Sequence, residues 1–213
     1  MRQPRKHIWQ RSAAIFLLMA AIIAIGACRS SRTGEISLLG PVDETDKAAA
    51  LVQEANAELQ KIKVIYNENE GDGQQAGKRE QLKKALEAND AAAVKKIADD
   101  VVYLINDGFD HGRAAVDKIA DAQDLKINDD YREYLRLKEE ALRKEMEAFE
   151  EYRQAARTLR DNYDPKNAQV RDKVKEEFKS RSENYARIME KARDLSSQAN
   201  EIAKEVRQRS LNN

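Results

Sequence analysis

The C-terminal half of this 213-residue chain contains almost nothing that interrupts a helix. From Arg113 to Asn213 there is no glycine and a single proline, Pro165. Glycine and proline carry the largest penalties in a helix interior, whereas Ala, Glu, Lys, Arg, Gln and Leu, which dominate this region, favour it. No stretch alternates Val, Ile and aromatic residues with the period of two that marks a strand. The sequence therefore predicts an all-α fold.

Apolar residues in this half repeat with the seven-residue period of packed helices. A predicted helix over residues 166–209 carries a row spaced alternately by four and three: Val174, Phe178, Arg181, Tyr185, Ile188, Ala192, Leu195, Ala199, Ile202 and Val206. A preceding helix over 129–163 repeats the pattern with Leu135, Leu142, Phe149, Ala156 and Tyr163. Its second row, with Tyr131, Tyr152 and Leu159, is diluted by Lys138 and Glu145. Such rows are typical of coiled coils and long bundle helices.

The two helices are separated by the short segment 162–165, in which Asp164 is the expected N-cap and Pro165 the first helical residue. A break this short predicts an antiparallel hairpin. At 1.5 Å per residue its arms would be about 50 and 65 Å long. Either the first half of the chain packs along these arms, or their tips project as a coiled-coil stalk.

The first half supplies shorter helices that could cover the hairpin. The expected elements are a helix from Asp43 or Thr45 to about Asn69, a loop over 71–77, a helical region from Lys78 to about Asp107 with a kink or new N-cap at Asn89-Asp90, a loop over 108–112, and a short helix through Val116 and Ile119. The complete prediction is a long antiparallel helical hairpin, coiled-coil-like, packed with shorter N-terminal helices as a bundle.

The N-terminus has the three parts of an export signal. Four basic residues and no acidic residue occupy positions 1–11, positions 12–27 are uncharged, and small residues precede Cys28, the single cysteine of the chain. The segment Ile25-Gly26-Ala27-Cys28 resembles the lipobox of bacterial lipoproteins, which consists of an aliphatic residue, two small residues and a cysteine. Two alternatives are an uncleaved signal anchor and an ordinary signal peptide cut after Ala27.

The resemblance implies that the Cys28 thiol receives a diacylglycerol and that the chain is cut just before it. The expected parts are a signal peptide over 1–27, a lipidated cysteine and flexible tether over 28–42, and a helical domain over 43–213. In enterobacterial lipoproteins an aspartate after the cysteine favours the inner membrane. Arg29 occupies that position here, so the resemblance implies an outer-membrane anchor facing the periplasm.

Charge argues against two classes of partner. The chain has 38 basic and 38 acidic residues, and removal of the four basic residues that precede Cys28 leaves 34 basic against 38 acidic. A nucleic-acid binder should carry a basic face, and a polybasic membrane-surface domain should cluster Lys and Arg. We therefore expect no nucleic-acid partner, and we expect the membrane to be reached through the lipid.

Patterns that suggest metal binding are weak. Residues 68–79 imitate the start of an EF-hand loop, but Arg79 stands where a bidentate Glu is required. His111, with Asp107 and Asp110, forms either a weak surface metal site or, as we expect, an ordinary polar turn. The chain has no haem-attachment motif, no phosphate-binding glycine loop after a strand and no nucleophile elbow.

Two further features of the heptad rows have alternative interpretations. Arg181 is either a register-setting residue that extends to the surface or a contact for an anionic ligand. Five tyrosines at helical spacing either pack in the core or line a ligand groove: Tyr131, Tyr134, Tyr152, Tyr163 and Tyr185.

We expect no catalytic, cofactor-binding or metal-binding residue and assign Cys28 alone a role, as the lipidation site. The leading hypothesis is a membrane-anchored envelope lipoprotein that acts as a non-enzymatic helical scaffold or interaction module. Its partner would be another envelope protein or a second copy of the chain. The alternative is a sensory bundle in which the tyrosine-bearing hairpin encloses a small molecule.

Overall fold

The structure, a computed structural model, describes residues 43–71 and 76–211, with side chains as far as residue 209. The predicted signal peptide, Cys28 and the tether lie outside the described residues. Five helices follow in order: α1 (Thr45–Glu70), α2 (Lys78–Glu87), α3 (Ala91–Gln123), α4 (Asp129–Asn162) and α5 (Ala168–Leu211). The all-α prediction is confirmed.

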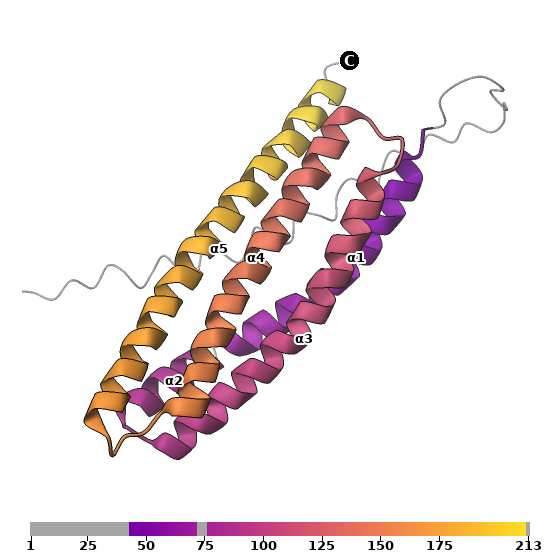
Figure 1. The fold of residues 1–213 in the computed structure, drawn as a ribbon. Coiled ribbons are helices and arrows are strands. Elements are labelled where there is room, and N and C mark those ends of the chain that lie inside the picture. The colour runs from indigo at the N-terminus through magenta and orange to yellow at the C-terminus, as the bar shows by residue number, and fades with distance from the viewer. Residues whose placement is uncertain (1–42, 72–75, 212–213) are drawn as a thin grey trace, which may run out of the picture. The chain divides into compact units, whose positions relative to one another are not determined.

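The helices pack in a sequential order that Figure 1 shows. The α4–α5 hairpin has the most extensive contact, α3 lies along α4, and α1 lies along α3. The short helix α2 packs on α3 and on the end of α1. The first half of the chain therefore packs along the long hairpin, as one of the two predicted arrangements required.

The bundle has two apolar cores. One is built from α2, α3, α4 and α5 and includes Leu82, Val101 and Leu159. The other is built from α1, α3, α4 and α5 and includes Ala55, Val116 and Leu135. Together, α1 and α2 therefore occupy the position of one helix in a four-helix bundle. Met146 packs against both cores and marks the level at which they meet.

Side-chain oxygens accept hydrogen bonds from backbone amides at the starts of α1, α3 and α4. Asp43 Oδ1 accepts hydrogen bonds from the amide and hydroxyl of Thr45 at 2.9 and 2.6 Å. Asp90 caps α3 by accepting from the amide of Ala93 at 3.0 Å, which confirms the predicted N-cap in this region. Asn128 caps α4 in the same way through the amide of Tyr131. These bonds satisfy amides that lack a partner within the helix.

The predicted loop over 108–112 is wrong, because α3 continues through it without a break. Both glycines lie where a neighbouring helix comes close. A Cβ at Gly108 would lie 3.7 Å from Ile65 of α1, and one at Gly112 would lie 3.0 Å from the sulfur of Met146 on α4. Gly112 makes room for close packing of α4, which offsets the roughly 1 kcal/mol that a glycine costs in a helix, whereas the space at Gly108 would also accept a Cβ.

The predicted N-cap of the last helix is also wrong. Asp164 Oδ1 accepts from the amide of Lys166 at 2.9 Å and forms part of a turn. The cap is Asn167, whose side chain accepts from the amide of Val170 at 3.2 Å, and α5 begins one residue later. Aspartate and asparagine both serve turns and caps, so the pattern placed the start three residues early.

Hydrogen bonds tie the helices together at both ends of the bundle. At one end Glu44 and Lys126 exchange two bonds, at 3.0 and 3.1 Å, so the chain enters beside the α3–α4 turn. At the other end Asn89, with a positive φ of 53°, accepts from the Tyr163 hydroxyl at 3.1 Å and from Lys175 at 3.0 Å. The α2–α3 and α4–α5 turns are thereby joined.

Candidate functional site

A cluster of aromatic side chains and one guanidinium fills the level at which α1 gives way to α2. Tyr152 of α4 and Tyr185 of α5 pack with ring centroids 5.5 Å apart. Arg79 of α2 lies over both rings, 5.9 and 5.5 Å from their centroids, and pairs with Glu70 of α1 at 3.2 Å. Phe149 joins this cluster through contact with Tyr185 at 5.9 Å. Cation–π contacts of this kind favour a fixed guanidinium position.

Burial dominates the electrostatics of these tyrosines. It raises the pKa of Tyr185 and of Tyr152 well above the ordinary value, because ionisation would place a phenolate in a dry environment. The Tyr152 hydroxyl has no hydrogen-bond partner among the described residues. Both rings are almost completely buried by neighbouring side chains. Together with Tyr134 and Tyr163, which are also buried, they fit the core interpretation of the tyrosine pattern.

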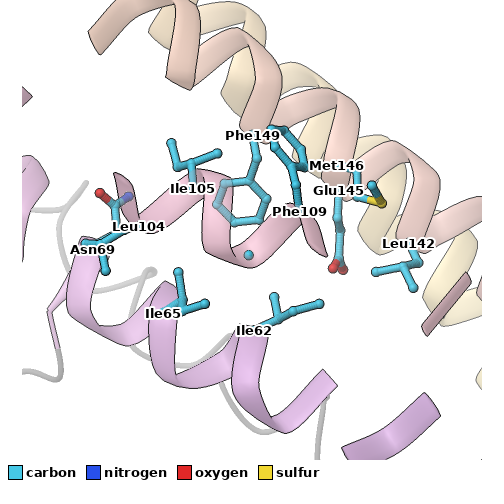
Figure 2. Close-up of a pocket in the computed structure, with 11 residues that line it drawn as sticks. Ile62, Ile65, Asn69, Leu104, Ile105, Phe109, Leu142, Glu145, Met146 and Phe149 are labelled. Atoms are coloured by element: carbon cyan, nitrogen blue, oxygen red, sulfur yellow. The ribbon is translucent and has the colours of Figure 1, made fainter. Parts of the chain in front are cut away.

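A small hollow lies between α1, α3 and α4, and Figure 2 shows the side chains around it. Its volume is about 20 Å³, the space of roughly one water molecule. Apolar residues form most of its wall: Ile62, Ile65, Leu104, Ile105, Phe109, Leu142, Met146 and Phe149. The two polar residues at its edge are Asn69 and Glu145. Asn69 is 2% exposed, and its side-chain oxygen has no partner among the described residues.

Glu145 is the more unusual of these two polar residues. Burial among apolar side chains raises the pKa of its carboxyl to about 7, and Lys138 and Arg193 oppose this only in part. In residues 43–71 and 76–211 the carboxyl makes neither a hydrogen bond nor an ion pair. Its side chain is half-buried and lines the hollow. Glu145 is therefore an isolated acid at the level where the two cores meet.

Lys138 lies seven residues earlier on the same face of α4. Its ammonium donates to Ser196 and Asn200 of α5 at 3.1 and 2.8 Å and lies 5.6 Å from the Tyr134 ring centroid. Burial lowers the pKa of Lys138 to about 8. The two charged residues that dilute the heptad row thus form a polar layer inside the bundle. The sequence identified both positions, but it contained no signal for their burial.

Arg181 forms ion pairs between the two hairpin helices. Its guanidinium lies 3.2 Å from Glu151 of α4 and 3.2 Å from Glu177 of α5, and about a third of the side chain is exposed. These contacts favour the register-setting interpretation. An open, polar groove runs beside it and includes Lys173, Glu176, Ser180 and Asn184.

His111 lies inside α3 instead of in a turn, and it contacts α1. Its Nδ1 is 2.6 Å from Glu58, which also accepts from Lys61 at 3.1 Å. The Lys61 and His111 contacts hold the pKa of Glu58 below its ordinary value. Over the described part of the chain, no group of three His, Cys, Asp or Glu residues could hold a metal ion. In the EF-hand-like segment, Arg79 pairs with Glu70.

Comparison with known proteins gives no match to a family model, to a curated protein or to a solved structure. Among residues 43–71 and 76–211, none of the helices has the length and apolar character needed to cross a membrane.

Proposed function

We propose that this protein is a lipid-anchored lipoprotein of the bacterial cell envelope that acts as a non-enzymatic helical scaffold or interaction module. The observation that carries the proposal is the segment Ile25-Gly26-Ala27-Cys28 behind a basic and apolar N-terminus. Acylation at Cys28 would hold the chain at a membrane, with residues 28–42 as the tether. Arg29 favours the outer membrane, with the helical domain facing the periplasm.

The geometry of the bundle supports a scaffold. The chain enters beside the α3–α4 turn, where Glu44 and Lys126 bond, and the C-terminal part of α5 pairs with the same end through Arg209 and Asp130 at 3.1 Å. The α2–α3 and α4–α5 turns lie at the opposite end of α4, whose 34 residues span about 50 Å. An anchored bundle would therefore present these two turns away from its attachment point.

The side-chain contacts give little support to the alternative function, a sensory bundle that encloses a small molecule. Tyr152 and Tyr185 pack against each other and against Arg79. The hollow lined by Phe149, whose ring contacts Tyr185, has the volume of about one water molecule, whereas ligand pockets measure several hundred Å³.

Fatty-acid labelling tests the anchor. Cells that express the wild type or Cys28→Ala are fed a radiolabelled fatty acid and then fractionated. We expect label and membrane attachment in the wild type and loss of both in the variant. Wild-type protein without label would refute the lipoprotein proposal, and Arg29→Asp tests whether the residue after the cysteine directs the choice of membrane.

Photo-crosslinking in intact cells tests the scaffold. A crosslinking amino acid is placed at Lys166, in the α4–α5 turn, or at Asp124, beside the α3–α4 turn, since both side chains are exposed. We expect a discrete adduct from position 166, with an envelope protein or with a second copy. The same amino acid at position 124 is the matched control at the anchored end. No adduct from either position would count against an interaction module.

A further inference from the structure

The large apolar side chains that hold α1 in the bundle are only partly buried. Its fully buried residues are Ala48, Ala55 and Asn69, of which two are small and the third is polar with an unpartnered oxygen. Its larger apolar residues, Leu51, Val52, Leu59 and Ile62, are partly exposed, and Val64 is 67% exposed. By contrast, α3 buries eleven residues, including several Val, Ile and Phe side chains. Elements with few buried apolar contacts open at low free-energy cost.

The carboxyl of Glu145 lies beneath this helix. Ile62, Ile65 and Asn69 of α1 form one wall of the hollow that Glu145 borders, as Figure 2 shows. The wall from α3 is formed by Leu104, Ile105, Gly108 and Phe109. The charges that act on Glu145 come from Lys138 on its own helix and from Arg193 of α5, which also bonds to the Tyr66 hydroxyl of α1. The residues of α1 and α3 that line the hollow carry no charge.

We propose that α1 is a pH-dependent arm of the bundle, docked over Glu145 while that carboxyl is protonated and released from α3 and α4 when it ionises. An ionised carboxylate without a partner is costly in an apolar hollow. Separation of the second half of α1 would expose the carboxylate to water and remove that cost.

The direction of the pH effect follows from burial. The docked state raises the pKa of Glu145 to about 7, from an ordinary value of 4.5. Between these two values the docked state binds more protons than the open state, so docking weakens as the pH rises. The equilibrium constant for opening should increase about tenfold per pH unit from about pH 5 to pH 7 and level off above pH 7.

Hydrogen exchange of the full-length protein, followed by mass spectrometry from pH 5 to pH 8.5, measures this opening. Exchange rates in each peptide are divided by the intrinsic rates at the same pH. We expect protection in the second half of α1 to fall at least tenfold between pH 5.5 and 7.5, while α3 and α4 change by less. Pulse times are chosen so that exchange remains limited by the opening equilibrium.

Variants assign the effect to the carboxyl. Glu145→Gln should remove the pH dependence of α1, and Glu147→Gln, which changes an exposed acid on the same helix, should retain it. Glu145→Met provides a second neutral variant, and His111→Gln tests whether the pair with Glu58 contributes. A flat wild-type profile would overturn the proposal. So would equal changes in α1, α3 and α4, or a Glu145→Gln profile that matches the wild type.

Discussion

At the scale of single residues, α4 carries two charged side chains whose ordinary ionisation is altered by burial. Glu145 and Lys138 lie seven residues apart on one face, and burial moves the pKa of the first up to about 7 and that of the second down to about 8. In both cases desolvation disfavours the charged form. Close to neutral pH both side chains carry charge, and the desolvation cost of the pair is then greatest.

Lys138 should make stability rise with pH in the alkaline range. Between its folded pKa of about 8 and its ordinary value of 10.5, the unfolded chain binds more protons, so unfolding becomes harder as the pH increases. The full effect is about 3 kcal/mol. Urea unfolding at pH 8 and 9.5 should show this rise in the wild type and not in Lys138→Met. Lys173→Met, at an exposed position, should keep it. An unchanged slope in Lys138→Met would contradict this assignment.

At the scale of elements, the position of a glycine relative to the neighbouring helices decides how its replacement changes stability. Gly108 and Gly112 lie one turn apart in α3, yet they meet different surroundings. A Cβ at Gly108 would make ordinary contact with Ile65, 3.7 Å away, whereas one at Gly112 would lie within 3.0 Å of Met146. The sequence pattern treats the two positions alike and predicts a loop, because the helices that approach them are distant in sequence.

The two glycines should therefore respond differently to alanine. Gly108→Ala should raise the free energy of unfolding by about 0.5–1 kcal/mol, since it gains helix propensity without a clash. Gly112→Ala should fall short of this gain or destabilise the protein, because Met146 must move. Chemical unfolding of both variants tests the difference. Equal gains would show that the Met146 contact imposes no constraint.

At the scale of the whole molecule, one side chain of the short helix α2 joins α1 and α2 to the α4–α5 hairpin. Arg79 of α2 pairs with Glu70 of α1 and lies over the rings of Tyr152 and Tyr185. It therefore contacts three other helices, α1, α4 and α5, at the level where α1 gives way to α2. The planar guanidinium combines an ion pair with stacking, which an ammonium cannot do equally well.

Arg79→Lys should destabilise the protein by about 1 kcal/mol, because the lysine retains the charge but loses the contacts with both rings. Arg113→Lys is a matched control, since Arg113 is exposed and pairs with Asp110 on its own helix. The control should change stability by less than about 0.5 kcal/mol. Thermal and urea unfolding of both variants provide the comparison, and equal small effects would refute a bridging role for Arg79.

The sequence alone determined most of the helical segments, because propensity, heptad spacing and caps are local properties. It located the long hairpin and predicted a kink or a new N-cap at Asn89-Asp90, and it marked Lys138 and Glu145 as charged interruptions of an apolar row. Tertiary structure decided that α3 runs through Gly108 and Gly112 and that α1 covers Glu145. These outcomes depend on side chains that approach from other helices, and neither helix periodicity nor composition specifies which surfaces meet.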